Sequence, residues 1–177
     1  MYKRQSQGCE VIHLGHDRGA DEVARAAIQE DAHAVAITSY QGGAVEMFTH
    51  TKEILQKKGF EHVFLFGGGG GTILPKEIEH LKEQGISKIY SPDDGRDLGL
   101  VGMVRDAMTS ASGTDLLAES RFDQITDQVD ADDHAAVSLL LTMAENSPPD
   151  QFSDKLSQAR SRDCLLYTSD AADDQAC

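Results

Sequence analysis

The chain has 177 residues and carries 16 Lys and Arg against 30 Asp and Glu, a formal net charge of −14. A protein this acidic is a poor electrostatic match for a phosphate backbone, so we expect no nucleic-acid partner. No apolar run approaches the ~20 residues that a membrane span needs. The three cysteines are too few and too scattered for a disulfide framework or a structural zinc site. These exclusions leave a soluble, cytoplasmic protein as the expectation.

The acidity is uneven along the chain. Residues 1–110 have a net charge of −4, whereas residues 111–177 have a net charge of −10 and lack the glycine-rich and β-branched runs of the first part. We therefore predict a principal domain over residues 9–110 and a helical linker segment over residues 111–160. Separate terminal segments are expected over residues 1–8 and 161–177.

The first part alternates short apolar runs with amphipathic segments. The apolar runs predict strands at residues 10–14, 34–38, 62–66 and 88–90. The amphipathic segments predict helices at residues 21–30, 44–58, 75–84 and about 98–108. Repeated β-α units of this length are typical of an α/β fold in which helices cover both faces of a parallel sheet.

Unusual residues follow three of the predicted strands, where open parallel sheets bind their ligands. They are the stretch Ser39 to Gly43, the five glycines 67–71 with Thr72, and the pair Tyr90-Ser91. Five consecutive glycines are entropically costly to order, so we favour the close approach of a flat or bulky ligand over a flexible turn or a phosphate nest. No Lys follows the last glycine, so the run does not match the phosphate loop of nucleotide-binding proteins.

The same residues carry a resemblance to a known family. Segments 27–31, 37–43, 67–71 and 90–96, in this order, resemble the cobalamin-binding domain of adenosylcobalamin-dependent acyl-CoA mutases, in particular the fused isobutyryl-CoA mutases. The similarity runs from about Cys9 to Met108 and continues more weakly through residues 139–146, which resemble a linker to a GTPase domain. It implies a flavodoxin-like sheet and adenosylcobalamin as cofactor. It also implies a parent chain whose mutase barrel and GTPase domain serve radical carbon-skeleton isomerisation of the isobutyryl-CoA or methylmalonyl-CoA type.

The resemblance also implies roles for the residues at the strand ends. Ser39 would hydrogen-bond the dimethylbenzimidazole end of the cofactor, and Gly42 and Gly43 would leave room beside its nucleotide tail. The glycine run would let the strand end pack against that tail, and Tyr90 and Ser91 would line the same groove. The expected cofactor-binding residues are Ser39, Tyr40, Gln41, Gly42, Gly43, Gly67, Gly68, Gly69, Gly70, Gly71, Thr72, Tyr90 and Ser91.

The family's cobalt ligand is a histidine in an Asp-x-His-x-x-Gly motif. His16 and Gly19 match the second half of this motif. Leu14 stands where the motif requires Asp, and the 23 residues from His16 to Ser39 hold only one helix and one strand. We therefore align residues 10–19 with the family's second strand and its loop, and expect His16 to be a surface residue. No metal ligand is predicted in this chain, and its first β-α unit is expected to be absent.

Both ends of the sequence carry a second resemblance. Residues 2–5 and 164–173 look like translated sequencing-adapter sequence, which places the natural segment within roughly residues 6–163. A disordered acidic tail is the plainer alternative. Either way, we expect a fragment without turnover of its own.

Residues 114–160 predict two helices, one over Leu116 to Val129 and one around Val137 to Leu141, with Asp132 and Asp133 at the start of the second. No catalytic residue is predicted anywhere in the chain. Two other functions remain open from the sequence alone. One is a non-catalytic corrinoid carrier or sensor, and the other is a flavodoxin-like flavin or nucleotide binder.

Overall fold

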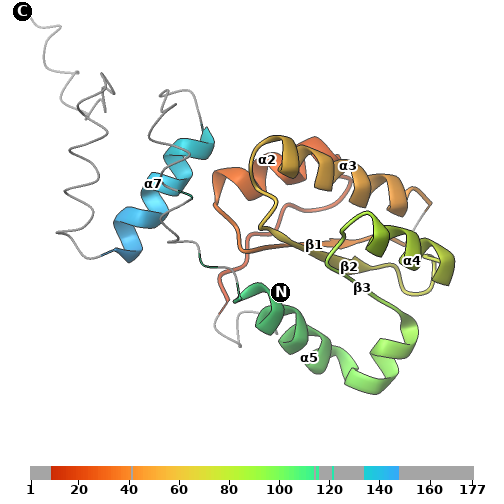
Figure 1. The fold of residues 1–177 in the computed structure, drawn as a ribbon. Coiled ribbons are helices and arrows are strands. Elements are labelled where there is room, and N and C mark those ends of the chain that lie inside the picture. Colours follow the sequence, from red (N-terminus) through yellow and green to blue (C-terminus); the bar gives the residue numbers. More distant parts are fainter. Residues whose placement is uncertain (1–8, 41, 114, 116–120, 122–133, 148–177) are drawn as a thin grey trace, which may run out of the picture. The chain divides into compact units, whose positions relative to one another are not determined.

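The computed structural model describes residues 9–40, 42–113, 115, 121 and 134–147. The chain divides into two compact units, residues 1–115 and residues 116–177. The first unit holds a parallel sheet in the order β1 (Ala34–Thr38), β2 (Phe64–Gly68) and β3 (Lys88–Tyr90). Helices α2 (Ala20–Gln29), α3 (Ala44–Lys57) and α4 (Pro75–Glu83) lie on one side of the sheet, and α5 (Pro92–Ala111) lies on the other (Figure 1). This confirms the predicted α/β, flavodoxin-like architecture.

The strands at residues 34–38 and 88–90 form as predicted, but the middle strand was placed two residues too early. We predicted residues 62–66, and β2 instead runs from Phe64 to Gly68. The pairing of Ile37 with Gly67 and of Thr38 with Gly68 extends the ladder into the glycine run. Backbone pairing with a neighbouring strand therefore overrides the low strand preference of glycine at these two positions.

The strand predicted at residues 10–14 is wrong, because these residues form no regular element. In the flavodoxin-like order 2-1-3-4-5, the second strand pairs only with the first. The part of the chain that the structure describes holds no such neighbour, so the segment has no ladder to join. Local contacts take its place: the Gly15 N–H donates to His13 Nδ1 at 3.1 Å, and Arg18 Nε donates to the Leu14 carbonyl oxygen at 2.7 Å.

The two faces of the sheet differ in burial. One face buries Val35, Ile37, Leu65 and Ile89 under α3 and α4, where Phe48, Leu55 and Leu81 are fully buried. On the opposite face Ala36 and Thr38 are exposed, while Phe64, Phe66, Lys88 and Tyr90 are half-buried. Only α5 covers this second face among the described residues. The β1 side of that face is therefore open.

Helix α5 begins earlier than predicted. A helix was expected from about Leu98, whereas Pro92 already occupies the first helical position. Ser91 caps the helix: its hydroxyl accepts from the Asp94 N–H at 3.2 Å, and the Asp94 carboxylate accepts from the Ser91 N–H at 2.7 Å. Gly99, with φ 62° and ψ 171°, breaks the helix into two parts at a conformation that essentially only glycine adopts.

In the second unit the structure describes one helix, α7 (His134–Asn146). It confirms the helix predicted around Val137 to Leu141. Leu139 and Met143 are buried on this helix. Most of the helix predicted over Leu116 to Val129, and the cap predicted at Asp132 and Asp133, fall outside the described residues. Among the described helices, none has the length and apolar character needed to span a membrane.

Candidate functional site

The carboxyl ends of the three strands meet at the edge of the sheet where α3 and α5 begin (Figure 1). The Ser39 N–H donates to the Gly68 carbonyl oxygen at 3.1 Å, which continues the β1–β2 ladder past the end of β1. The Thr72 hydroxyl lies 3.1 Å from the Ser39 carbonyl oxygen and 2.7 Å from that of Gly69. Ser39, Thr72 and the first glycines of the run thus form one hydrogen-bonded cluster at the strand ends.

The first three glycines of the run are enclosed by the protein itself. A Cβ at Gly67 would overlap the Ile37 carbonyl oxygen and lie 2.8 Å from Phe48 Cζ. A Cβ at Gly68 would lie 2.8 Å from the Tyr90 carbonyl oxygen. A Cβ at Gly69 would overlap both the Ser39 carbonyl oxygen and the Thr72 hydroxyl. Internal packing therefore requires a bare backbone at these three positions, independently of any ligand.

The last two glycines turn the chain away from the sheet. Gly70 and Gly71 have φ values of 58° and 98°, in the left-handed region that favours glycine. A Cβ at Gly70 would lie 2.8 Å from the ring of Tyr40, whose side chain is 72% exposed. A Cβ at Gly71 would lie 3.4 Å from the ring of Pro92, at the start of α5. The loop after β2 is therefore bordered by residues that follow both neighbouring strands.

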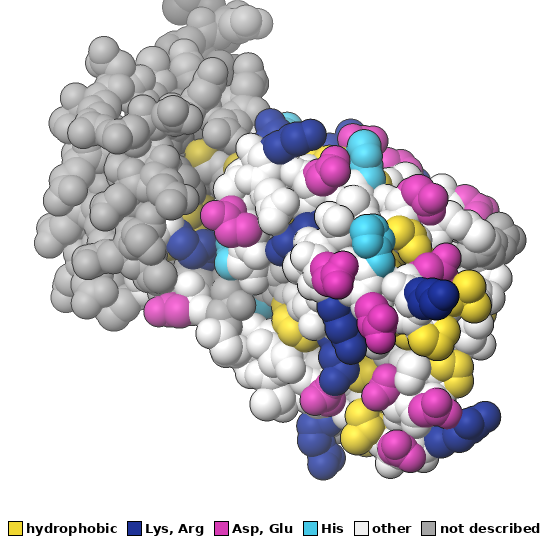
Figure 2. All heavy atoms as spheres, turned by 45° about the vertical axis from the view of Figure 1, so that its right-hand side comes forward, with side chains coloured by type: hydrophobic (Ala, Val, Ile, Leu, Met, Phe, Trp, Pro, Cys, Tyr) yellow, Lys and Arg dark blue, Asp and Glu magenta, His cyan; other side chains and the backbone are white. Residues whose placement is uncertain are grey.

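The loop after β1 provides the open part of the site. Gly42 is exposed, and a Cβ added there would meet nothing within 4 Å. Gly43 is equally open and caps α3 with a φ of 89°. Gln41 lies outside the described residues. Figure 2 turns this end of the sheet forward and shows hydrophobic side chains among acidic and basic ones. Tyr40, Leu74 and Leu98 are exposed hydrophobic residues of this region.

Tyr90 and Ser91 lie at the same edge, but both side chains already have partners in the protein. The Tyr90 hydroxyl donates to Asp106 Oδ2 at 2.7 Å, and the Ser91 hydroxyl donates to Asp94 Oδ2 at 2.8 Å. The two bonds from Ser91 hold the pKa of Asp94 below its ordinary value. Burial and the Asp106 carboxylate raise the pKa of Tyr90. Its phenol is therefore a neutral hydrogen-bond donor throughout the physiological range.

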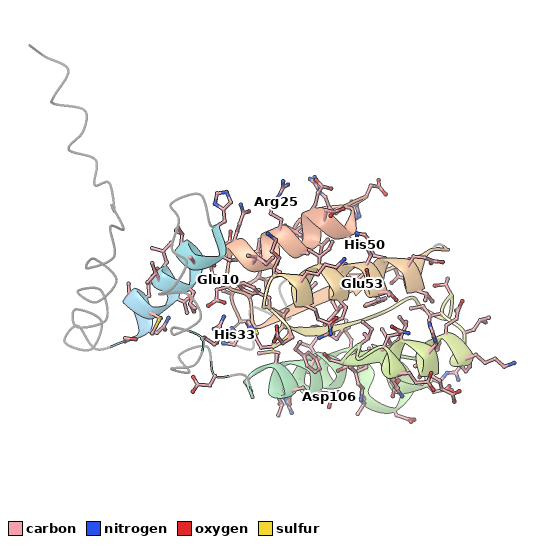
Figure 3. All side chains as sticks on the ribbon, turned by 45° about the horizontal axis from the view of Figure 1, so that its top comes forward. Glu10, Arg25, His33, His50, Glu53 and Asp106 are labelled. Carbon is pink, nitrogen blue, oxygen red and sulfur yellow. The ribbon has the colours of Figure 1, made fainter. Side chains whose placement is uncertain are left out.

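Sequence reasoning missed Asp106 and Lys88, which form a cluster with Tyr90. Lys88 Nζ lies 3.6 Å from Asp106 Oδ2 and 5.4 Å from the centre of the Tyr90 ring. Figure 3 labels Asp106 on α5, which lies across the sheet from the helix carrying His50 and Glu53. Tyr90 and Asp106 are 16 positions apart and lie on different elements, so the packing of α5 against the sheet brings the two together.

His16 is exposed in the loop before α2, and its ring lies edge-on to that of His13 at 6.5 Å. Within the described ranges, no three His, Cys, Asp or Glu side chains converge in a way that would hold a metal ion. Cys9 is a half-buried free thiol.

The chain was compared with known proteins. The family model described as the B12 binding domain matches residues 1–93. The chain belongs to the B12-binding domain family. The three parallel strands with helices on both sides agree with the fold of this family. The predicted membership of this family is thereby confirmed.

Several relatives are acyl-CoA mutases. The fused isobutyryl-CoA mutase of Cupriavidus metallidurans is 49% identical over 82% of this chain, and that of Geobacillus kaustophilus is 42% identical over 80%. The methylmalonyl-CoA mutase of Escherichia coli is 30% identical over 44% of the chain. The B12-binding chain spans 13% of the length of each of the first two relatives and 14% of the third.

Proposed function

We propose that the strand-end cluster binds the nucleotide tail of cobalamin and that the parent protein is an adenosylcobalamin-dependent acyl-CoA mutase. The observation that carries this proposal is the convergence of Ser39, the loop from Gly69 to Thr72 and residue Tyr90 at the carboxyl ends of three adjacent strands. Beside that edge, Ala36 and Thr38 leave the sheet face uncovered. An open apolar face next to an exposed aromatic ring suits a flat heterocycle such as benzimidazole.

The residues of the cluster and of the loops beside it have different proposed roles in binding. Ser39 is assigned the hydrogen bond to the benzimidazole end, and the exposed Tyr40 ring is assigned to pack on the tail. Gly42 and Gly43 leave the space through which the tail passes, because nothing lies within 4 Å of a Cβ built at either position. The loop from Gly69 to Thr72 forms the floor of the site. Ser91 acts through the start of α5, since its hydroxyl is bonded to Asp94.

Cobalamin, when bound, supplies the chemistry: homolysis of a cobalt–carbon bond starts the radical rearrangement of an acyl-CoA. The role of this chain is to bind and orient the cofactor, and we assign the cobalt no ligand from His16. The adenosyl form of the cofactor, the partnership with a mutase barrel and a GTPase domain, and the cytoplasmic location are parts of the same proposal. The similarity to fused isobutyryl-CoA mutases supports the mutase assignment, and these three parts follow from what the family resemblance implies.

Titration of the full 177-residue chain with hydroxocobalamin tests this function. A change in the visible spectrum of the corrinoid is expected, with no corresponding change for flavin mononucleotide. Binding of the flavin instead of the corrinoid would overturn the proposal in favour of a flavin-binding function.

Glycine substitutions then locate the site. A Cβ at Gly42 meets nothing within 4 Å, so Gly42→Val is expected to preserve the fold and to weaken cobalamin binding by about tenfold. Gly19→Val is the matched control, because a Cβ there is equally free of contacts and lies at the start of α2. Equal affinities for the wild type and Gly42→Val would contradict the assignment of the tail to the strand-end cluster.

A further inference from the structure

The Tyr90 side chain is held by three different groups. Asp106 Oδ2 accepts its hydroxyl at 2.7 Å, the Phe66 ring meets it edge-on with centres 6.3 Å apart, and Lys88 Nζ lies 5.4 Å from its centre. Phe66 and Lys88 come from the sheet, whereas Asp106 comes from α5. The rotamer of Tyr90 is therefore fixed jointly by the sheet and by the helix that covers it.

The held ring lies beside the bare end of β2. Gly68 is in register with Tyr90, and paired residues of parallel strands project to the same face of the sheet. That face continues to Thr38, which is in register with Gly68 and exposed. The Tyr90 ring is thus the large side chain that borders a strip formed by Gly68 and Thr38 on the open face.

Asp106 is not part of the strand-end cluster, but its hydrogen bond fixes the position of the Tyr90 ring. Its carboxylate is the only hydrogen-bond acceptor found for the Tyr90 hydroxyl among the described residues, and Lys88 Nζ approaches the same oxygen at 3.6 Å. Loss of that acceptor would leave a partly buried phenol without its partner. The ring would then be driven to turn toward water, into the space above Gly68 and Thr38.

We propose that Asp106 is a positioning residue for the cobalamin tail, acting through the Tyr90 hydroxyl to hold the aromatic border of the tail site. This inference rests on the proposed function, because it takes the strip beside Gly68 as part of the cofactor site. In this proposal Asp106 acts only through Tyr90 and does not touch the cofactor. The competing explanation is a purely structural clamp, in which Asp106 only fastens α5 to the sheet.

A double-mutant cycle on the full chain tests whether Asp106 acts through the Tyr90 hydroxyl. Hydroxocobalamin affinity is measured by visible spectroscopy for wild type, Tyr90→Phe, Asp106→Ala and the double variant, each with circular dichroism as a check of folding. Asp106→Ala is expected to weaken binding by about tenfold. Tyr90→Phe should lose less, because it has no hydroxyl to be left unpaired, and the double variant should bind no more weakly than Asp106→Ala. Independent losses that multiply in the double variant would overturn the inference.

Conservative replacement gives a second readout. Asp106→Asn removes the charge as Asp106→Ala does, but keeps a carbonyl oxygen that accepts from Tyr90. We therefore expect it to restore affinity to within about threefold of wild type. Asp93→Ala is the control for a lost carboxylate on the same helix, since Asp93 is exposed and pairs only with Arg96 in the described contacts. An Asn variant as weak as the Ala variant would contradict a role through the hydrogen bond.

Cobinamide, a corrinoid without the nucleotide tail, shows which part of the ligand depends on Asp106 for its binding. Its affinity is expected to be the same for wild type and Asp106→Ala, whereas a structural clamp predicts equal losses for cobalamin and cobinamide. Failure of the wild type to bind hydroxocobalamin would refute the proposed function and this inference together. Unchanged cobalamin binding by Asp106→Ala would refute the inference alone.

Discussion

The Thr72 hydroxyl lies 3.1 Å from the carbonyl oxygen of Ser39, a residue 33 positions earlier in the chain. The same hydroxyl lies 2.7 Å from the Gly69 carbonyl oxygen within its own loop. One side chain therefore links the segment that follows β1 to the segment that follows β2. Because both segments belong to the proposed cofactor site, the stability of this link and the affinity for cobalamin should change together.

Replacement of Thr72 by valine removes the hydroxyl and keeps the shape of the side chain. We expect Thr72→Val to lower the free energy of unfolding by about 1 kcal/mol and to weaken cobalamin binding. Thr72→Ser keeps the donor and should retain most of both properties. Urea denaturation and a cobalamin titration measure the two quantities, and a valine variant as stable as the serine variant would show that the contact contributes nothing.

The glycine run predicts a sharp contrast between two alanine substitutions. Gly67→Ala places a Cβ against the Ile37 carbonyl oxygen and Phe48, so it should lower the free energy of unfolding by at least about 2 kcal/mol. Gly42→Ala adds a Cβ in open space at a position without a positive φ, and should be neutral or stabilising by about 0.5 kcal/mol. Equal stabilities of the two variants in urea would argue against the packing around Gly67.

The break in α5 predicts a second contrast within one helix. Gly99→Ala forces a side chain into a glycine conformation with φ 62° and ψ 171°, so a loss of about 1–3 kcal/mol is expected. Gly95→Ala, four residues earlier, meets only the end of Met103 at 3.9 Å and should raise stability by up to about 1 kcal/mol. Thermal unfolding of both variants provides the test, and a stabilised Gly99→Ala would mean that α5 is continuous.

The burial of Lys52 leads us to expect that the free energy of unfolding increases with pH. Its side chain is buried on α3 and donates to the Glu61 carbonyl oxygen at 3.2 Å, and burial lowers its pKa below the ordinary 10.5. The unfolded chain therefore binds this proton more tightly than the folded chain. Relative to Lys52→Met, the wild type should gain stability as the pH rises from the lowered pKa toward 10.5.

The measurement for Lys52 is best made in a Tyr90→Phe background. The raised pKa of Tyr90 has the opposite effect, because ionisation of the unfolded phenol above pH 10 removes stability from the folded chain. With that group absent, the stability difference between the Lys and Met variants reports Lys52 alone. A difference independent of pH would contradict its burial.

Much of the fold could be predicted because its signals are local. The continuous apolar run Ala34–Thr38 and the proline-initiated helix at Pro75 formed with boundaries close to those expected. The errors arose where a distant partner decides the structure. Residues 10–14 have the composition of a strand, but the described residues offer them no strand to pair with. Gly67 and Gly68 lack that composition and are strand residues because β1 and β3 lie beside them.

The start of α5 was a different kind of error. Ser91, Pro92 and Asp94 carry the sequence signals of a helix cap, but Gly95 and Gly99 are poor helix formers within the residues that follow. For the site, the topology of a parallel sheet was enough to predict which loops meet. It did not predict that the Tyr90 hydroxyl is bonded to Asp106, because that contact depends on how α5 packs across the sheet.

The enclosure of the glycine run has a consequence for how this protein can vary. The atoms that exclude a side chain at Gly67 belong to β1 and α3. Those at Gly68 belong to β3, and those at Gly69 belong to the loops that follow β1 and β2. At each position one of the nearest atoms is a backbone carbonyl oxygen, which no amino-acid exchange can remove. Second-site suppressors of substitutions in the run should therefore be rare. In a saturation-mutagenesis library these three positions should stay depleted even when selection acts on folding alone.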